Sequence, residues 1–497
     1  MSIFDLKSGS DVRGVALEGY GEEVTLTDEV VKSIVGAFIV FLKNKLGFEK
    51  ELTVGLGYDS RLSSERLHDA CIEVMKESGI KILDSGLSST PSMFFLTQNP
   101  ENNCDGAVMI TASHHPVQKN GLKFFTKEGG LEGSDIQTLL EIADRGELAI
   151  GDKCAVLKKD YMKEYASSLV QLVRDKCGEE EPLSGFKIVV DAGNGVGGFY
   201  VNSVLRPLGA DTAGSQFLDP DGRFPNHIPN PEDAAAMRSI SNCVTTNQAD
   251  LGIIFDTDVD RAALVGKDGT EINRNKLIAL ISAILLEEQP GAYIVTDSVT
   301  SEGLKKFIEK RGGVHHRFKR GYKNVIDEAI RLSGEGKTVP LAIETSGHAA
   351  LKENHFLDDG AYLITRLLIC AAKLKKDEKE LTDLIADLEL PVEDTEVRLS
   401  FKTENWKEYG ESIIRNLTEF SSKVLAPETS TYEGVRANVD YAKGWFLARM
   451  SVHDPIMPIN IECSQKGGVK LIAKLLYSFF SQYAGIDSEP LRILSTT

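Results

Sequence analysis

The chain has few cysteines, and none of them is spaced as a redox or disulfide motif. Its 497 residues contain seven, at positions 71, 104, 154, 177, 243, 370 and 463, with no CxxC among them. This scatter predicts reduced thiols in a cytosol-like compartment. No basic segment followed by an apolar run begins the chain, so we expect a cytoplasmic protein, or one of the plastid stroma if a transit peptide has been removed.

Basic charge and long apolar runs are also scarce. The formal net charge of -18 argues against nucleic acid as a partner, although a small phosphorylated ligand needs only a few local cations. The most apolar stretch, IVGAFIVFL at residues 34–42, is too short to span a bilayer. We therefore expect no membrane partner and interpret this stretch as a buried helix.

No GxSxG nucleophile elbow is present, yet a polar cluster directly follows an apolar, strand-like run. The stretch MITASHHPVQKNGLKFF, residues 109–125, contains Ser113, His114, His115 and Lys123. One interpretation is structural, with Ser113 as a helix cap in a surface turn. The other is that a phosphorylated Ser113 carries nearly two negative charges and supplies an oxygen ligand.

A pattern of strand, polar turn, helix and second strand occurs at residues 52–86, 186–216 and 292–318. Such units predict parallel or mixed sheets covered by helices, and hence three similar α/β domains. The last part of the chain has short strand-like runs and a helical segment near residues 468–484, which predicts a smaller α+β domain. We expect the acidic stretch 390–396 to be the linker before it.

The strongest chemical signal is LGIIFDTDVDRAALV, in which Asp256, Asp258 and Asp260 follow an apolar strand and precede Arg261. Three alternating carboxylates on a loop can converge, and a bound hard cation would relieve their repulsion. Mg²⁺ is the first choice, because the pattern lacks the glycine and glutamate of a calcium-binding EF-hand loop. The alternative is a solvated acidic turn.

Two glycine-rich stretches resemble nucleotide-binding motifs. DAGNGVGG, residues 191–198, has GxGxxG spacing, and Asp211 follows near the position that a dinucleotide fold requires. An irregular loop, PDGRFPNHIPNPED, then replaces the next alternating unit, which disfavours that interpretation. GEGKT, residues 334–338, lacks the first glycine of a P-loop and is interpreted as a solvated turn.

Two further strand ends carry polar groups. LAIETSGHAAL places Glu344, Ser346 and His348 where they suit sugar hydroxyls. GWFLARMSVHDP places Arg449 and Ser451, followed by His453, in an arrangement that suits a phosphate, because a guanidinium can contact it with two hydrogen bonds.

Together these motifs resemble the α-D-phosphohexomutase superfamily of phosphoglucomutases, phosphomannomutases and phosphoglucosamine mutases. GSDVRG, GYDSRLSS, TASHHP, DTDVDR, ETSGH and RMSVHDP occur in the family's order over nearly the whole chain. The resemblance is strongest to the plant-type branch labelled phosphoglucosamine-mutase-like. It implies an α/β fold of four domains around a central cleft, for which we expect bounds of 1–183, 184–275, 276–390 and 391–497.

The resemblance also implies a mechanism, in which phosphorylated Ser113 exchanges its phosphoryl group with a hexose phosphate through a hexose 1,6-bisphosphate. Mg²⁺ would be bound by the phosphoserine and the three aspartates. Lys123 matches a general acid/base, Arg13 and Arg261 match residues that stabilise the transferred group, and His114 matches the histidine beside the serine. The residues expected to bind substrate are Glu344, Ser346, His348, Tyr322 and Lys323, with Arg449, Ser451 and His453 at the distal phosphate.

The sequence departs from the family pattern at Ile343, Tyr322, His453 and Asp454. These departures leave the sugar open between glucose or mannose and glucosamine. The leading hypothesis is a phosphohexose mutase, monomeric or homodimeric, with a phosphosugar substrate and the bisphosphate as activator. Two alternatives stay open: a non-catalytic sugar-phosphate sensor on the same fold, and an NAD-dependent oxidoreductase using the glycine-rich turn.

Overall fold

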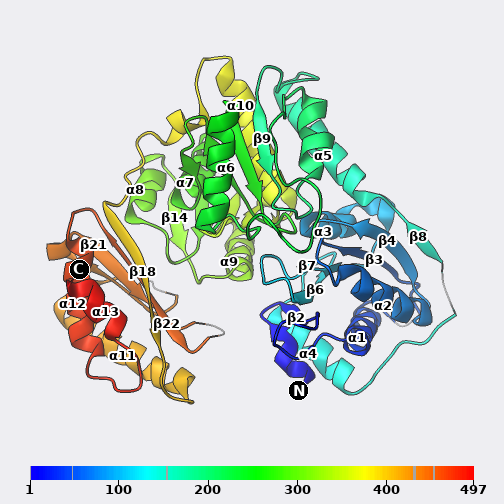
Figure 1. The fold of residues 1–497 in the computed structure, drawn as a ribbon, viewed down its shortest axis with the longest axis horizontal. Helices are drawn as coiled ribbons and strands as arrows, with labels where there is room; N and C mark the ends of the chain where they lie inside the picture. The colour runs from blue at the N-terminus through cyan, green and yellow to red at the C-terminus, as the bar shows by residue number, and fades with distance from the viewer. Residues whose placement is uncertain (1, 48, 153–154, 429–431, 452–453, 497) are drawn as a thin grey trace. The chain divides into compact units, whose positions relative to one another are not determined.

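The structure is a computed structural model that describes residues 2–47, 49–152, 155–428, 432–451 and 454–496 (Figure 1). The chain divides into two compact units. The first unit contains Met1–Leu277 and Ser346–Leu384, and the second contains Ile278–Thr345 and Ile385–Thr497. Within the described residues, no helix is long and apolar enough to cross a membrane.

The first unit begins with a mixed sheet in the order β1-β2-β6-β5-β3-β4-β8, and the short strand β7 pairs with the end of β6. Strands β5, β3, β4 and β8 are parallel, whereas β2, β6 and β5 pair in antiparallel fashion. The strands are β1 (Lys7–Ser8), β2 (Asp11–Val15), β3 (Thr53–Tyr58), β4 (Lys81–Leu87), β5 (Gly106–Ile110), β6 (Lys119–Thr126), β7 (Gly129–Gly130) and β8 (Val156–Lys158).

Helices cover both faces of this sheet, because its central strands are apolar on both sides. In β5, Val108 and Ile110 belong to one core cluster, while Ala107 and Met109 belong to another. The first cluster is closed by α1 (Asp28–Leu46), α2 (Ser64–Glu77) and α4 (Gly133–Asp144), and the second by α3 (Thr90–Gln98) and α5 (Tyr161–Cys177). Helix α1 confirms the buried helix expected at residues 34–42.

A second sheet of this unit has the order β12-β11-β10-β9, formed by β9 (Ile188–Asp191), β10 (Leu251–Phe255), β11 (Ala262–Gly266) and β12 (Glu271–Ile272). Helix α6 (Ala234–Asn247) packs on one face. On the other, Tyr200 contacts the Phe255 ring and hydrogen bonds at 2.7 Å to Thr365 of α10 (Gly360–Lys375). Strands β16 (Ala349–Leu351) and β17 (Leu357–Asp358) form an antiparallel pair in the same unit.

The strand–helix–strand prediction is only half right at residues 186–216. Its first strand is β9, but its helix consists of a short π-helical turn, Val201–Leu205, and a 3-10 turn, Arg206–Leu208. The second strand is reduced to two isolated bridges, at Asp211 and Gln216. Between them Gly214 adopts a left-handed φ of 100°, which interrupts an extended segment.

The second unit contains parallel strands and an antiparallel C-terminal sheet. Strand β13 (Tyr293–Thr296) pairs with β14 (Val314–Arg317) and β15 (Leu341–Ile343), accompanied by α8 (Glu302–Lys310) and α9 (Tyr322–Gly334), and α7 (Asn275–Glu288) leads into it. The C-terminal sheet has the order β18-β22-β21-β20-β19. Its elements are β18 (Glu393–Ser400), β19 (Ala426–Pro427), β20 (Val435–Val439), β21 (Gly444–Ala448), β22 (Ile456–Cys463), α11 (Trp406–Val424), α12 (Gly468–Phe480) and α13 (Glu489–Thr496).

The expected linker at residues 390–396 is wrong in its second half. Residues from Glu393 onward form β18, which pairs with β22 over eight residues. Val397 and Leu399 alternate with polar residues and enter the C-terminal core, so the acidic stretch continues directly into an amphipathic strand.

Candidate functional site

The Ser113 loop, residues 111–118, connects β5 to the antiparallel β6. Ser113 is 4 % exposed and has a left-handed φ of 51°, a conformation that a non-glycine residue keeps only where its surroundings hold it. No helix begins there, so the capping interpretation is wrong. Thr111 Oγ1 accepts from the Ser113 amide at 2.9 Å, and Ser113 Oγ donates to Asp256 Oδ2 at 2.8 Å.

The aspartate loop, residues 256–261, connects β10 to the antiparallel β11. One carboxylate oxygen from each of Asp256, Asp258 and Asp260 lies within 4.8 Å of the other two. All three residues are at most 1 % exposed. The convergence expected from the alternating spacing is therefore present, and the solvated-turn interpretation is wrong.

Electrostatics in this cluster are uneven. Burial and the Asp260 carboxylate raise the pKa of Asp256 well above its ordinary value. Burial also acts to raise the pKa of Asp260, but Lys123 and Arg261 outweigh it, and that pKa is lowered. Lys123 Nζ lies 2.5 Å from Asp260 Oδ2 and 3.3 Å from Asp258 Oδ2. The raised pKa of Asp256 shows that a third buried negative charge is unfavourable here, and a bound divalent ion would relieve that repulsion.

The donor set fits a hard cation. Among the described residues, Asp258 Oδ1 and Asp260 Oδ1 are buried without a hydrogen-bond partner, a costly state that a bound cation would relieve. The three aspartates offer only oxygen, the ligand type that Mg²⁺ prefers. Ser113 Oγ already lies against one of these carboxylates and can join them.

Arg261 joins the two loops. Its Nη2 donates to Ser113 Oγ at 3.0 Å and to Asp256 Oδ2 at 3.0 Å, and it also contacts His114 Nδ1. Burial and the Arg261 charge lower the pKa of His114 far below its ordinary value, so its imidazole is neutral. Because Nδ1 accepts from the guanidinium, His114 orients the arginine and carries no proton on that nitrogen.

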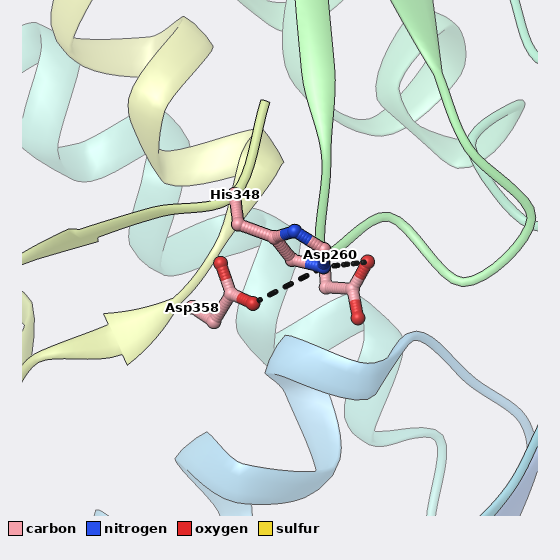
Figure 2. A group of neighbouring side chains, drawn as sticks. All are labelled: Asp260, His348 and Asp358. Carbon is pink, nitrogen blue, oxygen red and sulfur yellow. Dashed lines mark ion pairs between the residues drawn. The ribbon is translucent and has the colours of Figure 1, made fainter. Parts of the chain in front are cut away.

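His348 approaches the aspartate loop from the segment before β16 (Figure 2). Its Nε2 lies 3.7 Å from Asp260 Oδ1 and 3.6 Å from Asp358 Oδ2, beyond hydrogen-bond range. Its Nδ1 is 2.9 Å from Ser346 Oγ. Burial, Arg261 and Lys123 lower the pKa of His348 well below its ordinary value. A neutral ring is thereby held beside Asp260, a contact that the sequence did not predict.

Arg61 contacts the Ser113 loop, a role that our sequence analysis did not assign. It is 2 % exposed, and its Nη1 donates to the carbonyls of Pro116 at 3.0 Å and Lys119 at 2.9 Å. Its Nη2 donates to the carbonyls of His115, at 2.6 Å, and Ser113. One guanidinium therefore fixes the path of the whole loop.

The signal for Arg61 was present in GYDSRLSS, where a buried Asp59 precedes it by two residues after a strand. Asp59 Oδ1 accepts from the Arg61 amide at 3.0 Å, and Asp59 Oδ2 accepts from Thr111 Oγ1 at 2.7 Å. Local sequence could not show which carbonyls, more than fifty residues later, the arginine reaches.

Thr90, the first residue of α3, supports the aspartate loop and was not predicted from the sequence. Its Oγ1 donates to Asp258 Oδ2 at 2.5 Å, and its amide donates to the Asp258 carbonyl at 2.9 Å. Placing a carboxylate at a helix N-terminus is favourable, because the unpaired amides there carry partial positive charge.

The glycine turn, residues 192–198, packs against the aspartate loop. The Val196 amide donates to the Thr257 carbonyl at 2.9 Å. A Cβ on Gly195 would meet Thr257 O at 2.6 Å, and one on Gly198 would meet Leu218 O at 2.2 Å. These glycines permit close approach of neighbouring backbone, which accounts for the GxGxxG spacing without a dinucleotide.

The remaining predicted residues of the first unit include Arg13, on β2. Its Nη2 donates to Asp11 at 2.9 Å, and its charge contributes to the lowered pKa of His115, which burial lowers most. Arg13 is thus part of the electrostatic environment of the Ser113 loop.

The other predicted substrate residues belong to the second unit. Glu344 follows β15 and accepts from the Gly321 amide at 2.6 Å, directly before Tyr322, the first residue of α9. Lys323 pairs with Asp327 at 2.5 Å. Arg449 follows β21 and is 8 % exposed, and the Ser451 amide donates to Ile456 O at 3.1 Å. His453 lies outside the described residues.

The chain is similar to known proteins over most of its length. Three family models match in order: phosphoglucomutase/phosphomannomutase α/β/α domain I at residues 6–149, domain II at residues 161–269 and domain III at residues 273–389. A Neisseria meningitidis phosphoglucomutase is 30% identical over 471 residues, covering 94% of this chain and 95% of its own.

A Pseudomonas aeruginosa phosphomannomutase/phosphoglucomutase is 29% identical over 439 residues, covering 88% of this chain and 89% of its own. Among solved structures, a phosphoglucomutase/phosphomannomutase family protein from Burkholderia thailandensis is 26% identical, with a TM-score of 0.81 over 99% of both chains. The match of sequence, fold and domain order shows that the chain belongs to the phosphoglucomutase/phosphomannomutase family, within the α-D-phosphohexomutase superfamily.

Proposed function

We propose that this protein is a Mg²⁺-dependent phosphohexose mutase that interconverts hexose 1-phosphate and hexose 6-phosphate through phosphorylated Ser113. One observation carries the proposal: Ser113 Oγ lies 2.8 Å from Asp256 and 3.0 Å from Arg261, at a buried cluster of three carboxylates. A serine so placed has no general-base triad, but it is well placed to carry a phosphoryl group beside a cation.

In the proposed reaction the phosphoryl group leaves Ser113 Oγ for the free hydroxyl of a hexose phosphate, which gives a hexose 1,6-bisphosphate. The bisphosphate then returns its other phosphoryl group to Ser113. When bound, Mg²⁺ would be held by Asp256, Asp258 and Asp260 and would neutralise charge on the transferred group. Arg261 binds the Ser113 oxygen in both steps, and Lys123 exchanges the hydroxyl proton.

The motif residues that do not take part in phosphoryl transfer are proposed to bind and select the substrate. Glu344, with Tyr322 and Lys323 near its strand end, would contact sugar hydroxyls, as would Ser346 and His348. Arg449 and Ser451, followed by His453, would bind the phosphate that does not react, and that binding would orient the sugar. The preferred sugar is proposed to be glucose or mannose, or else glucosamine, and the plant-type branch stays a prediction.

The test is a coupled mutase assay with glucose, mannose, glucosamine and N-acetylglucosamine phosphates, each with its 1,6-bisphosphate as activator. We expect turnover of at least one sugar, and a mass increase of about 80 Da on Ser113 that Ser113→Ala removes. Binding of hexose phosphate without turnover of any sugar would favour the sensor. A Ser113→Ala protein of undiminished activity would refute the phosphoserine mechanism.

A further inference from the structure

The proposed mechanism gives no role to the irregular loop at residues 219–230, DPDGRFPNHIPN, yet this loop contacts the aspartate loop at Arg261 and the residues that support the Ser113 loop. We call it the covering loop. We infer that His227, held by Asp191, is a positioning residue for phosphoryl transfer: it fixes the covering loop so that Asn230 orients Arg261. The inference rests on the proposed function and assigns no substrate contact to His227.

The covering loop is tied to the glycine turn at several points. Asn194 Nδ2 donates to the Asp219 carbonyl at 2.9 Å, and the Asp221 amide donates to the Asn194 carbonyl at 2.9 Å. Asn226 Nδ2 donates to Asn194 Oδ1 at 2.8 Å. Asn194 itself has a left-handed φ of 61°, which turns its groups toward the loop.

The Asp191–His227 pair is the buried anchor of the loop. Asp191 ends β9, is 0 % exposed, and accepts from the Gly193 amide at 2.9 Å and from Gln216 Nε2 at 2.7 Å. His227 Nε2 lies 3.0 Å from both Asp191 oxygens, and Nδ1 lies 2.9 Å from the Ile228 carbonyl. Both ring nitrogens therefore face acceptors, an arrangement that the doubly protonated ring satisfies.

The pKa of His227 is consistent with that arrangement. Burial alone would lower it, but the hydrogen bond and the charge of Asp191 outweigh burial, and the pKa of His227 is raised. The pair thus acts as a charge-assisted contact, which is stronger and more directional than a neutral one.

Three residues after His227, Asn230 reaches the catalytic arginine. Asn230 Oδ1 accepts from Arg261 Nη1 at 3.2 Å and from the Glu232 amide at 3.0 Å, which fixes the orientation of the amide group. Arg261 Nη1 thus donates to Asn230, while Nη2 faces Ser113 Oγ and donates to it. The guanidinium plane is set by Asn230 on one side and Asp256 on the other.

The same loop also packs on the residues that clamp the Ser113 loop. A Cβ on Gly222 would meet Leu62 N at 2.4 Å and Ser60 O at 2.5 Å, so the two backbones are in contact. The Arg61 guanidinium lies 5.4 Å from the centroid of the Phe224 ring. The covering loop therefore contacts the supports of both catalytic loops, which is why its anchor matters for their geometry.

The test compares His227→Ala, His227→Gln, Asn230→Ala and the double variant His227→Ala/Asn230→Ala. We expect His227→Ala to lower kcat roughly 10- to 100-fold, since small displacements of a catalytic group cost that much, while KM changes little. His227→Gln keeps one hydrogen-bond donor, so its kcat should lie between those of the wild type and His227→Ala. The double variant should be no slower than the slower single variant, because both changes act through one contact.

The matched control is His68→Gln, which weakens another pair of a histidine and an aspartate. His68 Nε2, on α2, lies 2.9 Å from Asp84 Oδ1, on β4. This variant should leave kcat within about twofold. Amide hydrogen exchange at residues 111–118 and 256–261 supplies a readout besides activity, and should accelerate in His227→Ala but not in His68→Gln.

Unchanged kcat and exchange in folded His227→Gln and Asn230→Ala proteins would overturn the inference, as would multiplicative losses in the double variant. An inactive wild-type protein would instead refute the proposed function, and the exchange comparison would still decide whether His227 positions the loops.

Discussion

The Ser113 loop and the aspartate loop both connect antiparallel strands, but different kinds of contact hold them. The Ser113 loop depends mainly on one side chain, because Arg61 binds three of its carbonyls and also the carbonyl of Lys119, where β6 begins. The aspartate loop is held by backbone from three separate segments, through the amides of Thr90, Val196 and Gly360. Support is thus concentrated in the first loop and distributed in the second.

This difference follows from what each loop must do. The aspartate loop holds three like charges together, so its backbone must resist their repulsion when no cation is bound. The Ser113 loop presents one oxygen from a left-handed residue, which requires a defined path more than charge balance. Single substitutions should therefore act mainly through charge in the aspartate loop and mainly through the position of the serine in the Ser113 loop.

The largest effect is expected from removing charge in the aspartate loop. Asp260→Asn leaves Lys123 and Arg261 without their shared carboxylate and removes a proposed ligand of the cation. We expect kcat to fall by at least about 100-fold, together with weaker Mg²⁺ binding measured by calorimetry. Asp268→Asn, in the exposed turn between β11 and β12, should change neither quantity by more than about twofold. Equal losses in both would contradict the assignment.

The next largest effect is expected from weakening the contact between Arg61 and the Ser113 loop. Arg61→Lys keeps the charge but loses the planar fork, so fewer of the four carbonyls are satisfied. We expect kcat to fall roughly 10- to 100-fold and the free energy of unfolding to fall by about 1–3 kcal/mol. Mg²⁺ affinity should fall much less than in Asp260→Asn, because the three aspartates have their own supports. A large loss of Mg²⁺ affinity in this variant would show that the two loops are not held separately.

A smaller effect is expected at the glycine turn. Gly195→Ala places a methyl group against the Thr257 backbone and should displace the aspartate loop, lowering kcat about tenfold. Gly334→Ala is the control, since its Cβ would meet nothing within 4 Å. Steady-state kinetics of both variants measure the difference, and equal rates would mean that the glycine turn yields without moving the loop.

The smallest effect is expected from removing one hydroxyl group. Thr90→Val deletes the hydrogen bond to Asp258 and keeps the backbone one, so distributed support should limit the loss of kcat to about fivefold or less. Thr97→Val, on the same helix, deletes a hydrogen bond to the Phe94 carbonyl and should leave kcat unchanged. A loss in Thr90→Val as large as that in Arg61→Lys would remove the contrast between the loops.

Much of the site follows from local sequence. The alternating aspartates after an apolar strand predicted the convergence of carboxylates, because strand and loop geometry alone bring i, i+2 and i+4 side chains together. The pairing of Ser346 with His348 was likewise local. The approach of Ser113 to Asp256 spans 143 residues, and it was suggested by the idea that a phosphorylated serine completes the aspartate site and by the order of the family motifs.

What local sequence could not predict depends on contacts between distant segments. The carbonyls that Arg61 binds, and the Thr257 backbone that Gly195 approaches, are set by which strands pair within one sheet: β3 lies beside β5, and β9 lies beside β10. The missing second strand before Gln216 and the extension of β18 to Glu393 were errors of the same kind, since pairing partners decide whether a polar segment becomes a strand.

The most direct measurement is a single turnover of protein phosphorylated on Ser113 with a hexose 6-phosphate that it accepts, followed by intact mass and product analysis. The account predicts that the protein loses about 80 Da as one equivalent of hexose 1,6-bisphosphate appears, and that Ser113→Ala forms none. Isomerisation with the phosphate retained on Ser113, or turnover by Ser113→Ala at the wild-type rate, would contradict it.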